Sequence, residues 1–133
     1  MTAVRDVLVA ICAALPETEF ETGEYPGWKV PAGPRGKTFL KYREPRKDAV
    51  DPETGERYND LLVVWVPDQD AKAALLADEG LPFFSTPHFD GYNAVLVHEA
   101  RLGEIERDQL VEILTEAWAA RAPKRVVAAY FSR

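Results

Sequence analysis

The sequence predicts an α+β domain in which an antiparallel β-sheet carries helices packed on one face, in the order α-β-β-β-(β)-α-β-α-α. Apolar residues recur at helical spacing near both ends of the chain and alternate with polar residues between them. The alternating segments are joined by connections of hairpin length, which favour antiparallel pairing. With 133 residues, the chain has the length of one domain, residues 1–133.

Residues 2–15 are predicted to form the first helix, with Thr2 as its cap and Pro16 ending the run. The apolar face of this helix contains Val4, Leu8, Ile11, Cys12 and Leu15. Cys12 is the only cysteine, so the chain has no internal disulfide and no zinc site built from cysteines. We expect Cys12 to be a small buried residue of the core.

Three or four strands are predicted to follow the first helix. The segments "TEFETGEYPGWKVP" and "GKTFLKYRE" alternate polar and apolar residues between Gly and Pro, which is typical of short strands joined by tight turns. In the second segment the alternation places Thr38, Leu40 and Tyr42 opposite Phe39, Lys41 and Arg43. The segment "PRKDAVDPETGERYND" has almost no large apolar residue, so about residues 44–60 are predicted to form an exposed polar loop.

The rest of the chain is predicted to contain the last of these strands, one further strand and three helices. The run "LLVVWVP" is apolar at almost every position and predicts a central strand covered on at least part of both faces. Asp68 can cap a short helix that Gly80 ends, and "NAVLVH" predicts one more strand. The segment "EIERDQLVEILTEAWAARA" predicts a long helix, and Pro123 is placed to begin a last one in "PKRVVAAYF".

The charge and the residue patterns argue against several classes of protein. A net charge of -6 repels phosphate on average unless positive charge is gathered on one face. The N-terminus lacks a basic region before its apolar run, and no 18 consecutive residues are apolar, so we expect a cytoplasmic protein with no membrane partner. The sequence contains no H-E-x-x-H or calcium-loop spacing, so no metal and no cofactor are expected.

The stretch "FFSTPHFDGYNAVLVH" raises the question of a catalytic site, because it holds Ser85, His88 and Asp90. These are the residue types of a nucleophilic triad, but no G-x-S-x-G elbow and no evident oxyanion hole accompany them. We therefore expect a non-enzymatic protein without catalytic residues. In this interpretation the stretch is a turn, and His88 lies at the edge of a pocket.

Basic residues form a second feature, because they gather in a predicted hairpin within an acidic chain. The first hypothesis is a binding domain that contacts nucleic acid weakly and without sequence preference, as phosphate contact is the only evident mechanism. The residues expected to meet phosphates are Lys37, Lys41, Arg43, Lys124 and Arg125. The alternative for these residues is a solvated strand face with extended lysine side chains.

The second hypothesis is a module that binds a protein or a small ligand in an apolar groove beside the turn Pro87 to Tyr92. The residues expected to form this groove are Trp28, Trp65, Phe84, His88 and Tyr92. Binding that depends steeply on salt would favour nucleic acid, whereas thermal stabilisation by a ligand independently of salt would favour the groove.

Several segments, in order, resemble the MmcQ/YjbR-like family of small bacterial proteins. They are "VLVAICAALPETEF", "GWKVPAGPRGKTFLKY", "TPHFDGY" and "AWAARAPKR", and together they run through nearly the whole chain. The resemblance implies a CyaY-like (frataxin-like) or double-wing α+β fold. It also implies DNA binding by analogy with that fold, or, through frataxin, acidic metal delivery, and no particular reaction or cofactor. The chain departs from the shorter family pattern by its polar insertion around "DAVDPETGERYND".

Overall fold

The structure, a computed structural model, describes residues 4–132 and contains the predicted order of elements. The cap predicted at Thr2 lies outside these residues. The helices are α1 (Val4–Ala13), α2 (Gln69–Ala77), α3 (Arg107–Arg121) and α4 (Lys124–Phe131), with short 3-10 turns η1 (Pro87–Phe89) and η2 (Glu99–Glu104). The strands are β1 (Glu19–Glu21), β2 (Gly27–Val30), β3 (Lys37–Tyr42), β4 (Leu61–Trp65) and β5 (Ala94–His98).

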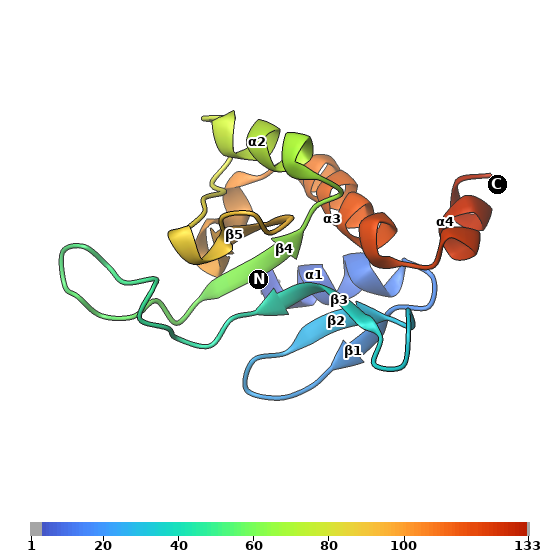
Figure 1. Cartoon of the computed structure of the whole chain (residues 1–133), viewed down its shortest axis with the longest axis horizontal. Coiled ribbons are helices and arrows are strands. Elements are labelled where there is room, and N and C mark those ends of the chain that lie inside the picture. Colours follow the sequence, from blue (N-terminus) through green and yellow to red (C-terminus); the bar gives the residue numbers. More distant parts are fainter. Residues whose placement is uncertain (1–3, 133) are drawn as a thin grey trace.

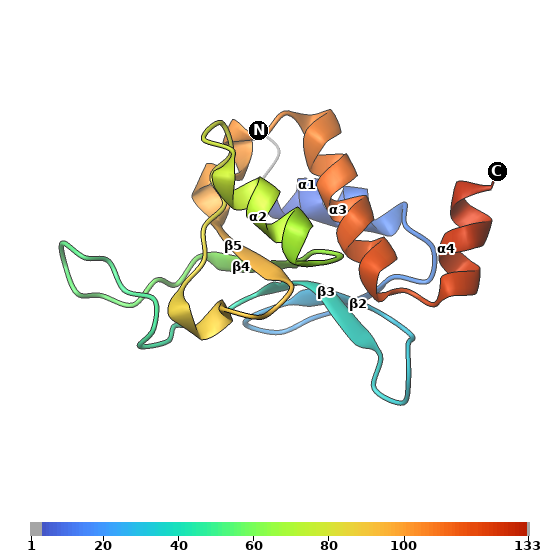
Figure 2. The same ribbon diagram turned by 45° about the horizontal axis from the view of Figure 1, so that its top comes forward.

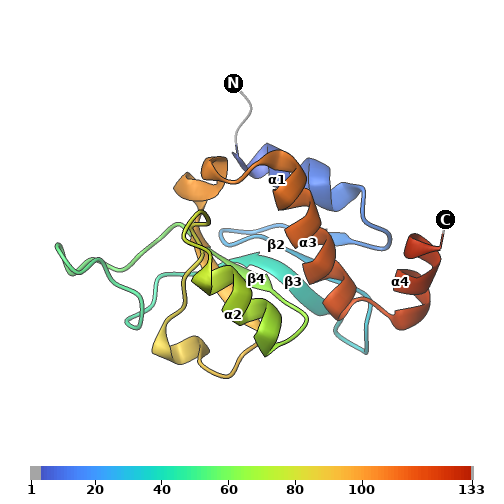
Figure 3. The same ribbon diagram turned by 90° about the horizontal axis from the view of Figure 1, so that it is seen from above.

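The five strands form one antiparallel sheet in the order β1-β2-β3-β4-β5 (Figure 1). Helices α1, α2 and α3 lie over the same face of this sheet, as the view from above makes clear (Figure 3). The predicted class, α+β with an antiparallel sheet and helices on one face, is therefore confirmed. Across residues 4–132, no helix combines the length and the apolar character needed to cross a bilayer.

The main core fills the space between the sheet and the helices, where Leu62 and Val64 of β4 meet Leu114 and Trp118 of α3. The predicted buried face of α1 is confirmed, because Cys12 is completely buried beside its apolar neighbours. Burying a large apolar side chain contributes about 1.5–3 kcal/mol, so this layer supplies most of the drive for folding.

A second, smaller core covers the other face of the sheet. It contains Ala49, Leu61, Val63, Phe89, Ala94 and Leu96. Because alternate residues of β4 point to opposite faces, the central strand is buried on both, as its unbroken apolar run predicts. In the described part of the chain, residues 4–132, no helix of more than one turn lies on this face, and the covering segments are the 44–60 connection and the turn that contains Phe89.

Two local features differ from the simple pattern. The strict alternation predicted for β3 fails, because its register against β2 shifts between Trp28 and Lys29 and leaves both Phe39 and Leu40 buried. Most of the 44–60 segment is exposed, as expected of a polar loop, but Ala49 is only 4% exposed. A small alanine side chain is enough to anchor the segment on the second core.

The 44–60 segment and α4 lie at opposite ends of the molecule in all three views (Figures 1, 2 and 3). The segment projects beyond the end of β3, whereas α4 follows the C-terminal end of α3. This separation decides which of the basic residues can act together.

Candidate anion-binding site

The site begins where β3 ends and the chain turns across the outer face of the sheet. Arg43 continues the pairing with β4, since its backbone N–H donates to the carbonyl of Leu61 at 2.8 Å. The buried Ala49 then holds the turn, and its carbonyl accepts from the N–H of Tyr58 at 3.0 Å. A bridge between Val50 and Arg57 folds the tip of the segment back on itself, so a residue fourteen positions after Arg43 returns to its side.

These connections surround an open cavity of about 590 Å³. Its lining residues are Arg43, Arg46, Lys47, Asp48, Arg57 and His88. Four permanent cations and one carboxylate thus face one cavity in a chain whose net charge is -6. Like charges that line one cavity repel each other, so positive potential is concentrated there, and a bound anion would reduce the repulsion between the cations.

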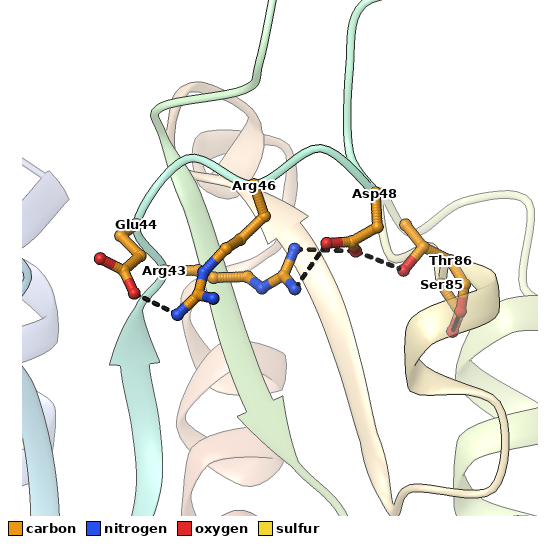
Figure 4. A network of polar contacts seen from close by, with 6 residues as sticks. All are labelled: Arg43, Glu44, Arg46, Asp48, Ser85 and Thr86. Carbon is orange, nitrogen blue, oxygen red and sulfur yellow. Dashed lines mark hydrogen bonds and ion pairs between the residues drawn. The ribbon is translucent and has the colours of Figure 1, made fainter.

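The Arg43 side chain is held in place on two sides. Its guanidinium donates to both oxygens of Asp48, at 3.0 and 2.9 Å, in the paired geometry that arginine forms with carboxylates (Figure 4). It also lies over the ring of Phe89, 4.8 Å from the centroid. Only 11% of the Arg43 side chain is exposed. The Arg43 guanidinium lowers the pKa of Asp48, to whose Oδ2 the Thr86 hydroxyl also donates at 3.3 Å.

The remaining cations differ in how far the protein itself neutralises them. Arg46 pairs with Glu44 at the rim of the cavity (Figure 4). Lys47 and Arg57 form no ion pair with any side chain of residues 4–132. Two of the four cations therefore remain free to interact with a ligand.

His88 reaches the cavity from a turn that α2 holds in place. The Lys72 side chain, only 6% exposed as a residue, donates to the carbonyls of Phe89 at 2.6 Å and of Tyr92 at 2.8 Å. Gln69 donates to the same Tyr92 carbonyl at 3.1 Å. The His88 ring lies nearly parallel to that of Tyr92, 6.1 Å between centroids, and Tyr92 is 58% exposed.

The residues of the rejected triad are not arranged as one. Ser85 Oγ donates to the carbonyl of Thr86 at 3.4 Å, and within residues 4–132 no hydrogen bond joins Ser85, His88 and Asp90. In the same part of the chain, no three His, Cys, Asp or Glu side chains converge to hold a metal ion. The polar groups gathered at this cavity suit the binding of an anion, because most of them are hydrogen-bond donors.

The basic residues named from the sequence fall into two groups. Arg43 lies in the cavity, and Lys41 lines a smaller adjoining cavity of about 210 Å³ that shares Arg43 and Arg46. Lys37 begins β3 at its other end, and Lys124 and Arg125 belong to α4. Arg125 there lies 3.7 Å from Glu17. The predicted set of five does not form one surface.

The five residues of the predicted apolar groove do not line one cavity, and one of them, Trp28, lies on the other face of the sheet. Trp28 is 2% exposed and belongs to the main core under the helices. Trp65 lines a separate cavity of about 280 Å³ with residues of α2 and α3. Phe84 packs on the ring of His98, at 5.2 Å between centroids. Trp65 and Phe84 both pack against the second core, whose Phe89 contacts the rings of His88 and Tyr92, but the cavity that His88 lines is basic.

Arg57 is the residue that sequence reasoning missed most clearly. It stands among acidic residues in "DPETGERYND" and has no basic neighbour in the sequence. One signal was present: Gly55, at φ +75°, allows a tight turn that brings Arg57 opposite Val50. Arg46 and Lys47 were visible in the sequence as part of the basic run. The ion pair of Asp48 with Arg43 was not, because it depends on side-chain geometry.

A family model described as YjbR matches residues 13–120 of the chain. The chain belongs to the YjbR family. The resemblance drawn from the sequence is therefore confirmed, and the matched region contains the whole sheet and the whole basic cavity of this YjbR-family chain. Helix α4 lies outside it.

Similar proteins extend the relationship without adding a function. Uncharacterized proteins of Mycobacterium bovis and Mycobacterium tuberculosis are 52% identical to the YjbR-family chain over 73 residues, which cover 55% of it and 54% of each relative. The chain thus spans about half the length of the curated relatives it matches. The crystal structure of a Deinococcus radiodurans protein with a DUF419 domain is similar with a TM-score of 0.56 and 17% identity, over 89% of this chain and 77% of that one. That likeness shows the fold alone.

Proposed function

We propose that this YjbR-family domain is a non-enzymatic binding protein whose ligand is a compact molecule with a phosphate group. The observation that carries the proposal is the convergence of Arg43, Arg46, Lys47 and Arg57 on one cavity of an acidic chain. Guanidinium groups present paired donors that match the oxygens of phosphate, and lysine adds a mobile positive charge.

The shape of the cavity supports a compact ligand. Its volume of about 590 Å³ lies within the range of sites that hold small molecules and cofactors, roughly 300–1,000 Å³. The cations of α4 lie at the opposite end of the molecule, so they cannot contact a ligand of this size in the cavity. His88 and the exposed ring of Tyr92 lie at one side, where an aromatic part of the ligand could stack.

Titration of the isotope-labelled protein with inorganic phosphate tests the proposal by magnetic resonance. The backbone signals of residues 43–49, 57 and 86–89 are expected to shift together. Lys47→Ala and Arg57→Ala should each weaken binding about 5-fold, since loss of one charge contact costs about 1 kcal/mol. Lys124→Ala is the matched control on α4 and should leave the affinity unchanged. Shifts confined to α4, or none at about 50 mM phosphate, would contradict the proposal.

Sequence-independent binding of single-stranded nucleic acid is the second candidate function. The observation that favours it is the adjoining cavity, because Lys41 there extends the positive surface beyond Arg43 and Arg46. An exposed aromatic ring beside a basic surface is typical of sites for single strands. Lys41→Ala should reduce the slope of log affinity against log salt by about 0.7, whereas Lys37→Ala, at the other end of β3, should not. Equal effects of the two changes would count against this surface.

A further inference from the structure

The basic cavity already contains an anion that belongs to the protein. Asp48 binds the Arg43 guanidinium through both carboxylate oxygens, which is the geometry that a ligand's oxyanion would adopt. Arg43 cannot easily turn to another partner, because its side chain is largely buried and its guanidinium lies over Phe89. Asp48 occupies the edge of the guanidinium between its two terminal nitrogens, so an oxyanion that binds this edge has to take the place of Asp48.

We infer that Arg43 is the main anchor of the cavity's ligand, and that the Asp48 carboxylate is an internal competitor which holds this place until a ligand's oxyanion displaces it. The inference rests on the proposed function and adds to it a carboxylate of the protein that lowers the affinity of the cavity for its ligand. It also explains why a paired arginine is directed into a cavity together with Lys47 and Arg57, two cations that form no ion pair within residues 4–132.

Displacement of Asp48 needs little movement of the chain. The backbone next to it is anchored by the buried Ala49, so the 44–60 segment stays in place while the Asp48 side chain rotates away. The Asp48 side chain is 27% exposed and can turn toward water, where its charge is well solvated. Apart from Arg43, its side-chain partner within residues 4–132 is the Thr86 hydroxyl, through a hydrogen bond that is long at 3.3 Å.

The strength of the competition follows from proximity. A group held in the same chain acts at an effective concentration in the millimolar range or above, so Asp48 resists any weak anion present at lower concentration. A phosphate dianion overcomes it, because it brings twice the charge and has oxygens left over for Lys47 and Arg57. At pH 8 Asp48 is ionised and inorganic phosphate is mostly the dianion, so proton exchange contributes little to the comparison.

The experiment measures the affinity of the full chain for inorganic phosphate at pH 8 and low salt. Asp48→Asn, which keeps the shape and removes the charge, should bind phosphate about 10-fold more tightly than the natural protein. Glu53→Gln makes the same change in net charge at the exposed tip of the 44–60 segment and should change the affinity less than 2-fold. Adding Arg43→Lys to Asp48→Asn should abolish the gain, since lysine lacks the paired donors.

A second variant guards against a failure of Asp48→Asn to fold. Thr86→Val keeps all charges and removes the hydroxyl that helps hold Asp48, so it should raise the affinity about 2-fold. If the natural protein binds phosphate and Asp48→Asn binds it equally or more weakly, Asp48 only positions Arg43, and the inference is overturned while the proposed function stands. If no variant binds phosphate, the proposed function fails and the inference fails with it.

Discussion

Replacing Lys72 with methionine probes the contact that holds the His88 turn against α2. The change keeps the aliphatic chain and removes the ammonium group, which donates to the carbonyls of Phe89 and Tyr92. Each hydrogen bond from a charged donor contributes about 1.5–3 kcal/mol, so the two together contribute about 3–6 kcal/mol.

Two effects reduce this figure. The methionine variant no longer has to keep an ammonium group out of water, which recovers several kcal/mol. Both carbonyls also keep another donor, because the Tyr92 N–H donates to Phe89 at 3.0 Å and Gln69 donates to Tyr92 at 3.1 Å. The expected net loss in the free energy of unfolding is about 2 kcal/mol, or a fall in Tm of roughly 6–10 °C for a domain of this size.

Urea unfolding of the natural and variant proteins gives the free energy directly, and amide hydrogen exchange reports on the turn. The Tyr92 amide should lose protection in Lys72→Met, since the turn opens more often without its clamp. Lys124→Met makes the same chemical change on the exposed face of α4 and should alter stability by less than about 0.5 kcal/mol. A Lys72→Met protein at least as stable as the natural one would refute the reasoning, because burial of the charge would then outweigh its hydrogen bonds.

Two further predictions concern stability. Burial raises the pKa of Cys12 to about 12 from 9.0, so the stability that the neutral thiol provides is complete below pH 9 and is lost as the pH rises from 9 to about 12. Between pH 8 and pH 10 the natural protein should lose about 1.4 kcal/mol more than Cys12→Ala in urea unfolding, and equal losses would contradict the assigned burial. Gly36→Ala should be more destabilising than Gly91→Ala in thermal unfolding: both glycines have positive φ, but only at Gly36 would an added Cβ lie 2.8 Å from the Val30 carbonyl oxygen. A larger loss at Gly91 would contradict this account.

Much of the fold could be predicted because its signals are local. The helical spacing around Cys12 and the unbroken apolar run of β4 each reflect which faces of a segment are buried, and neighbouring residues alone reveal that. The Asp68 cap was predictable for the same reason, and its carboxylate accepts from the Ala71 N–H at 2.8 Å. The burial of Phe39 was not, because the register shift depends on how β2 pairs with β3.

The candidate site was predictable only in part. The basic run pointed to Arg43 and Lys41, and the turn pointed to His88. The sequence also grouped Lys37 and Lys124 with these residues, but the structure places both away from the cavity, and nothing in the sequence indicates that separation. Because Trp28 is aromatic, the sequence suggested that it forms a wall of the groove. Side chains along β2 alternate between the two faces of the sheet, and the position of Trp28 directs its side chain into the main core.

The sequence by itself determined the class of fold and the burial of residues such as Cys12, because hydrophobic periodicity and turn chemistry act over a few neighbouring residues. Membership of the YjbR family followed from the resemblance of several segments to that family. Only the tertiary structure decided that Arg57 lines the same cavity as Arg43 and that Asp48 pairs with Arg43. It also decided that the cations of α4 lie at the opposite end of the molecule. The physical reason is that charges interact through space, at distances set by how strands pair and loops anchor, whereas spacing along a chain carries no record of those distances.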